Sequence, residues 1–234
     1  MSITNWKDHF SQIYSTEPDQ YQRLVAAEDA YGELAERVAA LVAGATTVVD
    51  IGAGTGRLTV PLCREGVHVH AIDSAAPMLA VAKRRLAACP GAWTVSVADA
   101  RDLPIADGWA DAAVAGWVYG HFTEWHPDLW RTELQKAISE MGRVVRTGGA
   151  EIVIDTLGTA EDEPGAPNAA LADYHDELER LGFQRSVLRT DYRFATVDES
   201  IELLDWFFGL GTWARDHDNP VVPEFTGWWQ RTSS

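Results

Sequence analysis

A short apolar segment that runs directly into three closely spaced glycines is the feature that most constrains this sequence. It reads VVDIGAGTGR over residues 48–57, with glycines at positions 52, 54 and 56. Glycines where a strand turns into a helix let the backbone approach a ligand closely, and they leave the N-terminus of that helix open. The segment therefore predicts a buried strand followed by a ligand-binding turn.

The rest of the chain alternates apolar segments with helical patterns. Residues 5–43 are expected to be helical, with Gly44 as the helix stop. Five strands separated by helices predict a parallel sheet with right-handed crossovers. The predicted strands are 46–51, 67–73, 93–99, 110–118 and 150–157, followed by a sixth near 184–195 and a last near 221–231. The predicted helices after the glycine turn are 55–65, 75–88, 127–146, 169–181 and 198–208.

Composition excludes several classes of function. The formal net charge of -16 over 234 residues repels a phosphate backbone, so we expect no nucleic-acid partner. Cys63 and Cys89 have no CxxC partner, which argues against a zinc site or a disulfide framework. No apolar segment approaches the roughly 18 residues that span a membrane, and MSITNWKDHF does not resemble a signal peptide. We therefore expect one domain, no membrane association and a cytoplasmic location.

Acidic residues follow the same edge of the predicted sheet as the glycine turn. Asp73 ends the second strand, about 20 residues past the turn, where a carboxylate can accept both hydroxyls of a ribose. Asp99 ends the third strand, where it can accept the amino hydrogens of an adenine. Asp50 precedes the first glycine and suits a ligand with a positive charge. Arg57 stands where a GxGxxG dinucleotide turn needs its third glycine, which disfavours a nicotinamide cofactor.

With Asp73, Asp99 and the segment DAAVAGWVYGHF at fitting intervals, VVDIGAGTGRLT resembles the class I S-adenosylmethionine-dependent methyltransferases, most closely their small-molecule branch. The resemblance covers roughly residues 46–157. It implies an α/β fold, a Rossmann-like three-layer sandwich with a mostly parallel seven-stranded sheet, an antiparallel last strand and an N-terminal helical lid. A single methyltransferase domain over 1–234 would comprise a helical cap (1–44), a cofactor-binding core (45–157) and a C-terminal part with acceptor-pocket elements (158–234).

The resemblance also implies a role for each matching position. The glycines would shape the pocket for the methionine part of S-adenosylmethionine, with Asp50 beneath it, while Asp73 would hold the ribose and Asp99 the adenine. Met78 would pack on the adenine, and residues 115–117 would flank the reactive methyl group. The expected cofactor-binding residues are Asp50, Gly52, Ala53, Gly54, Gly56, Arg57, Asp73, Ser74, Met78, Asp99, Ala100, Arg101, Ala115, Gly116 and Trp117. The product would be S-adenosylhomocysteine.

Candidate catalytic residues follow the fourth predicted strand. His121 is the best candidate base, because its ordinary pKa of about 6.5 suits proton transfer at neutral pH, and Tyr119 would line the pocket. Asp155 is a weaker candidate, and Tyr14 and Tyr21 lie in the expected lid. No metal is expected. The acceptor would be an oxygen or nitrogen atom of a small molecule, and the protein a monomer or homodimer. A nicotinamide-dependent oxidoreductase, a non-catalytic cofactor-binding module and a protein side-chain methyltransferase stay open as alternatives.

Overall fold

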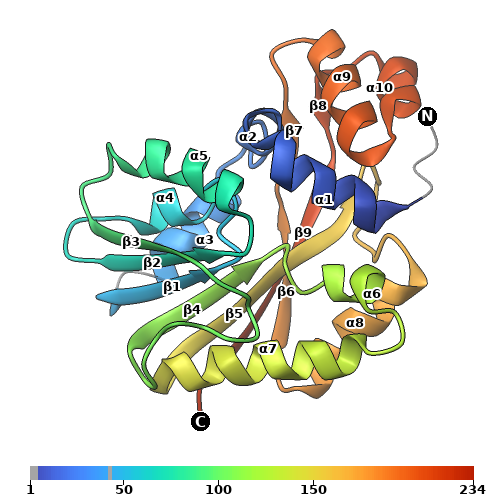
Figure 1. The fold of residues 1–234 in the computed structure, drawn as a ribbon. Coiled ribbons are helices and arrows are strands. Elements are labelled where there is room, and N and C mark those ends of the chain that lie inside the picture. The colour runs from blue at the N-terminus through green and yellow to red at the C-terminus, as the bar shows by residue number, and fades with distance from the viewer. Residues whose placement is uncertain (1–4, 42–43) are drawn as a thin grey trace.

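A seven-stranded sheet with the order β3-β2-β1-β4-β5-β9-β6 forms the centre of the molecule in the computed structural model, which describes residues 5–41 and 44–234 (Figure 1). Six strands run parallel, and β9 is antiparallel to both of its neighbours. The predicted sheet, with its antiparallel last strand, is confirmed. The strands are β1 (Thr47–Ile51), β2 (His68–Asp73), β3 (Ala92–Val97), β4 (Ala110–Gly116), β5 (Val145–Thr159), β6 (Gln184–Arg189) and β9 (Glu224–Thr232).

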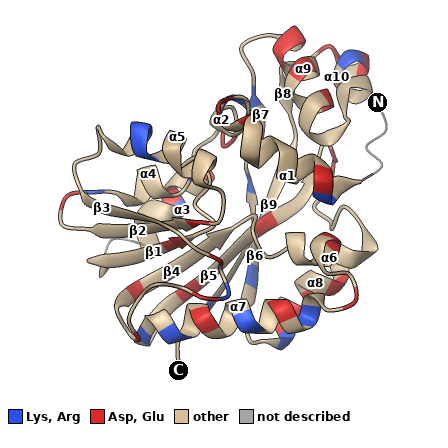
Figure 2. Cartoon of the chain, in the orientation of Figure 1, with Lys and Arg blue, Asp and Glu red and all other residues tan. Residues whose placement is uncertain are grey.

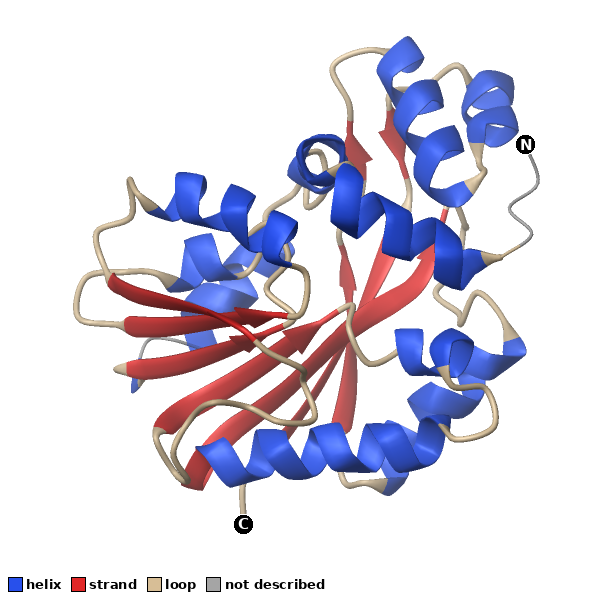
Figure 3. Ribbon diagram, viewed as in Figure 1, coloured by secondary structure: helices blue, strands red, loops and turns tan. Residues whose placement is uncertain are grey.

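Helices cover both faces of this sheet and make three layers (Figure 3). Val48 and Val49 show why, since alternate residues of a strand point to opposite faces: Val48 packs in one apolar core and Val49 in the other. The core around Val48 includes helices α3 (Glu33–Leu41), α4 (Thr59–Leu62) and α5 (Ala76–Leu86). The core around Val49 includes α6 (His121–Trp125), α7 (Trp130–Val144) and α8 (Ala169–Arg180).

A third apolar core lies above the sheet and joins the N-terminal helices to residues 192–222. Helices α1 (Trp6–Thr16) and α2 (Pro18–Ala26) pack there against α9 (Val197–Phe208), α10 (Gly211–His217) and the small sheet of β7 (Tyr192–Arg193) and β8 (Val221–Val222). We call this assembly the lid lobe (Figure 1). The division of the sequence into an N-terminal cap and a C-terminal part thus separates segments that pack together.

The single helical region expected over 5–43 is wrong in detail, because it divides into three helices; residues 42–43 lie outside the described residues. Pro18 begins α2, since proline is favoured at the first helical position and cannot continue α1. Before α3, Asp29 and Gly32 adopt positive φ angles of 63° and 79°. The Asp29 carboxylate then accepts the N–H groups of Leu34 and Ala35 at the start of α3.

Other predicted boundaries shift for local reasons. The helix expected over 55–65 shortens to α4, because positive φ angles at the glycines hold the preceding residues in a turn. The fourth strand stops at Gly116, before Trp117 turns with a φ of 56°. The last strand divides into β8 and β9 at Pro223, which has no N–H to donate. The sixth divides into β6 and β7, because the Asp191 side chain takes the N–H of Glu224 in place of a backbone carbonyl. Helices α6 and α10 were not predicted.

No helix in the described part of the chain is long and apolar enough to cross a membrane. Acidic residues occur both on the lid lobe and around the sheet, while α7 carries charges of both signs (Figure 2).

Candidate functional site

A cleft lies between the lid lobe and the carboxyl ends of β1, β2 and β4, where open α/β folds bind ligands. It contains about 800 Å³ of empty space, counting its opening to solvent. The sheet side contributes the glycine turn and the residues that end β2 and β4. Tyr14 and Tyr21 reach the cleft from α1 and α2, so the lid lobe closes one wall.

The glycine turn can take its shape only without side chains. Gly52, Gly54 and Gly56 have φ angles of 69°, 55° and 84°, a region that favours glycine. A Cβ atom on Gly52 would lie 2.1 Å from a methyl carbon of Val118. The turn thus brings its bare backbone to the cleft, and Arg85 holds it from outside by donating to the Thr55 carbonyl over 2.7 Å.

Asp73 lies at the end of β2 with both carboxylate oxygens in use. Oδ2 accepts the N–H of Gly54 over 2.8 Å, and Oδ1 accepts the N–H of Ala75 over 2.7 Å. Burial raises the pKa of Asp73, and these two N–H groups act against that rise. A carboxylate oxygen offers about two acceptor positions, so each oxygen keeps one for a ligand. This arrangement suits a pair of neighbouring hydroxyl groups.

Asp50 lies beneath the glycine turn, buried beside a smaller space of about 280 Å³. It accepts a hydrogen bond from the Thr59 hydroxyl. Burial raises the pKa of Asp50 to about 7, against the Thr59 hydrogen bond, which lowers it. A cationic group in this space would stabilise the carboxylate. Arg57 also lines the space, where its guanidinium pairs with the buried Glu28 and lies 3.3 Å from the centre of the Trp117 ring.

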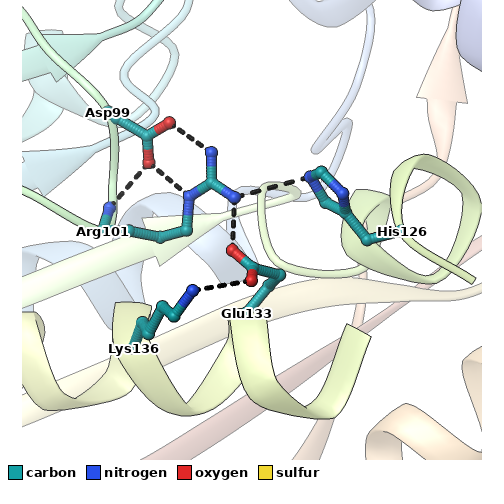
Figure 4. Close-up of polar contacts among 5 residues, drawn as sticks. All are labelled: Asp99, Arg101, His126, Glu133 and Lys136. Atoms are coloured by element: carbon teal, nitrogen blue, oxygen red, sulfur yellow. Dashed lines mark hydrogen bonds and ion pairs between the residues drawn. The ribbon is translucent and has the colours of Figure 1, made fainter. Parts of the chain in front are cut away.

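Asp99 and Arg101 form an ion pair at the other end of the cleft (Figure 4). Arg101 also contacts Glu133 of α7 and His126, and Lys136 holds the second oxygen of Glu133 over 2.8 Å. Hydrogen bonds from Arg101 lower the pKa of Asp99 further below neutral pH.

His121 begins α6 and faces the lid lobe. Its Nε2 lies 3.0 Å from the hydroxyl of Tyr14, and its ring stacks on Trp125 at 4.9 Å between centroids. Burial lowers the pKa of His121 to about 4, so the imidazole is neutral at pH 7. Burial likewise raises the pKa of Tyr14, which keeps its proton. The pair is thus a neutral, hydrogen-bonded couple at the wall of the cleft.

Residues 48–149 match the family model described as a methyltransferase domain. Over these residues the chain therefore carries a methyltransferase domain, and its fold is that of the Rossmann-like S-adenosylmethionine-dependent methyltransferases. It is similar to an uncharacterised methyltransferase of Mycobacterium tuberculosis, with 37% identity over 47% of this chain and 39% of that protein. A demethylmenaquinone methyltransferase of Beutenbergia cavernae is 31% identical over 73% of this chain and 63% of its own length. The fold also resembles phosphoethanolamine N-methyltransferase 2 of Haemonchus contortus, with a TM-score of 0.60, 16% identity, and coverage of 99% of this chain and 60% of that one.

Most residues predicted to bind the methyltransferase cofactor line the cleft or the smaller space beside Asp50, which share part of their lining. Two of the predicted set do not line them: Gly56, where a Cβ would meet Ala82 of α5 at 3.4 Å, and Ala115, which is buried in the sheet core. The predicted residues that do line them are Asp50, Gly52, Ala53, Gly54, Arg57, Asp73, Ser74, Met78, Asp99, Ala100, Arg101, Gly116 and Trp117.

The two residues predicted to be catalytic do not lie together in the structure. His121 lines the cleft, whereas Tyr119 is fully buried in the core beneath α6 and does not reach it. The hydroxyl near His121 belongs instead to Tyr14, 107 positions away in sequence. The sequence indicated Tyr14 only as part of a lid, and nothing local marked Phe122 or Trp125 as wall residues. Asp155 lies behind this wall, buried, and accepts the N–H of Thr156.

Proposed function

We propose that this protein transfers a methyl group from S-adenosylmethionine to an oxygen or nitrogen atom of a small molecule. The observation that carries the proposal is the cleft in which Asp73 leaves two acceptor positions beside a bare glycine turn. Asp73 would hold the ribose hydroxyls and Asp99 the adenine amino group. Asp50 would face the positively charged methionine end. Three acidic groups at these spacings match the donor groups and charge of this cofactor.

The acceptor would enter between the glycine turn and the wall made by Tyr14, His121 and Trp125. The cofactor supplies a methyl group that leaves its sulfonium sulfur as the acceptor atom bonds to it. The protein's task is to hold the acceptor in line with that bond and to exclude water. His121 is a weak base, because burial lowers its pKa to about 4. We therefore propose that it orients the acceptor and takes a proton only as the new bond forms.

A small acceptor agrees with two of the similar proteins, which are named for demethylmenaquinone and phosphoethanolamine. The chain matches less than two thirds of the length of these curated relatives. The activity of the whole protein is therefore proposed here. A cytoplasmic location and a monomeric or dimeric state stay predictions from the sequence.

Calorimetric titration tests the cofactor directly. We expect S-adenosylmethionine and S-adenosylhomocysteine to bind with micromolar affinity, about -7 to -8 kcal/mol, and NADH and NADPH not to bind. Heat with NADH alone would favour the oxidoreductase. Incubation of the protein with methyl-labelled cofactor and a small-molecule extract would then identify the acceptor. Binding without any labelled product would favour a non-catalytic module.

A further inference from the structure

The carboxylate of Asp99 is held in one orientation by a single neighbouring side chain. Oδ1 accepts two hydrogen bonds from Arg101, one from the backbone N–H and one from Nε, each 2.8 Å long. Oδ2 accepts one, from Nη2 over 2.6 Å. Because a carboxylate oxygen offers about two acceptor positions, Oδ1 is saturated. Only Oδ2 keeps a position for a ligand in the cleft that Asp99 lines.

Arg101 is itself fixed from the far side. Its Nη1 donates to Oε2 of Glu133, whose side chain is only 10% exposed, and lies 3.4 Å from Nε2 of His126. Lys136 holds the other oxygen of Glu133, and the ring of Phe122 lies 5.6 Å from the guanidinium carbon. The planar guanidinium thus connects the loop after β3 to α7 and cannot rotate away without breaking several contacts.

Resting on the proposed function, we propose that Arg101 is a positioning residue that aims Oδ2 of Asp99 at the exocyclic amino group of the cofactor's purine. The site then selects a 6-amino purine over a 6-oxo purine. An amino group donates to the free position on Oδ2. A 6-oxo group would place an acceptor oxygen against Oδ2 and would turn the neighbouring N1 from an acceptor into a donor, so the hydrogen bond that the amino group makes is lost. Asp99 is ionised at neutral pH, and Arg101 lowers its pKa further, so the carboxylate cannot donate a proton to repair that mismatch.

The test compares S-adenosylhomocysteine with S-inosylhomocysteine by calorimetry. The inosyl compound has an oxo group in place of the 6-amino group and a proton on the neighbouring N1. For the wild-type protein we expect a preference of about 10- to 100-fold for the adenosyl compound, the value of one charge-assisted hydrogen bond. In Arg101→Met, affinity for S-adenosylhomocysteine should fall about tenfold, and the preference should nearly vanish. Arg101→Lys should also lose most of the preference, because an ammonium group keeps the charge but cannot hold both oxygens.

Arg180→Met is the matched control, since Arg180 pairs with Glu177 on the exposed face of α8 and does not line the cleft. It should keep the wild-type preference. A full preference in folded Arg101→Met overturns the proposal, and Arg101→Lys decides by the same criterion if Arg101→Met does not fold. Failure of the wild-type protein to bind S-adenosylhomocysteine would instead overturn the proposed function.

Discussion

At the scale of single residues, the surroundings of His121 change what its chemistry can be. A histidine in water has a pKa of about 6.5, which suggested a base that becomes active as pH rises through 6 to 7. Burial against the aromatic wall lowers the pKa of His121 to about 4. The imidazole is therefore neutral throughout the ordinary working range, and its partner is a hydroxyl group from the lid lobe.

We expect the turnover of the native protein to show no rise between pH 6 and 7 that depends on His121. The neutral fraction of a group with a pKa of about 4 is already complete there. His121→Ala should lower kcat by about a hundredfold and leave affinity for S-adenosylhomocysteine nearly unchanged. Steady-state kinetics across pH, with the acceptor identified, measures both. A wild-type step near pH 6.5 that disappears in His121→Ala would show that the burial does not persist in the working enzyme.

Asp73 is the residue on which cofactor affinity should depend most. Asp73→Asn keeps the shape but replaces one acceptor oxygen with a donor, so affinity for S-adenosylhomocysteine should fall by about 2–3 kcal/mol. Because the carboxylate also holds the N–H groups of Gly54 and Ala75, the melting temperature should fall as well. Calorimetry and thermal unfolding measure the two effects. Asp162→Asn, on an exposed loop, should change neither, and unchanged affinity in Asp73→Asn would reduce Asp73 to a structural cap.

At the scale of elements, the sequence predicted what local patterns determine. The buried strands are visible as apolar segments, and the glycines locate the ligand-binding turn. Which side chains reach the cleft depends instead on long-range packing. Tyr119 is two residues before His121 in sequence yet faces the core, while Tyr14 reaches His121 from the lid lobe. Short helices such as α6 and α10 have too few residues for a period to show.

The turn after β1 gives a prediction at this scale. Gly52→Ala should lower the melting temperature and prevent S-adenosylhomocysteine binding, because φ is 69° there and the new Cβ would overlap Val118. The backbone strain alone costs about 1–3 kcal/mol. Gly165→Ala is the control, since a Cβ at Gly165 meets nothing within 4 Å and its φ is not positive. Thermal shift with and without ligand measures both variants, and a stable, binding Gly52→Ala would contradict the close approach.

At the scale of the whole molecule, charge is the dominant property. A net charge of -16 is spread over the lid lobe and the sheet, so the folded state concentrates mutually repelling carboxylates (Figure 2). Ion pairs such as Arg23 with Glu202 are exposed and contribute little. Raising NaCl from about 10 to about 200 mM shortens the range of repulsion. We therefore expect the melting temperature to rise by a few degrees, measured by scanning calorimetry. A fall would mean that the ion pairs outweigh the repulsion.

The lid lobe unites the N-terminal helices with residues 192–222, and β9 inserts between β5 and β6. During synthesis on a ribosome, every residue that lines the cleft, from Tyr14 to Trp125, has emerged when little more than half of the chain exists. The strands β5, β6 and β9 and the helices α9 and α10, with which α1 and α2 share an apolar core, come later. A growing chain therefore carries the whole lining of the site before the parts that hold it in place. Cofactor binding would then be stable only once α9 and α10 support the lid helices, late in folding.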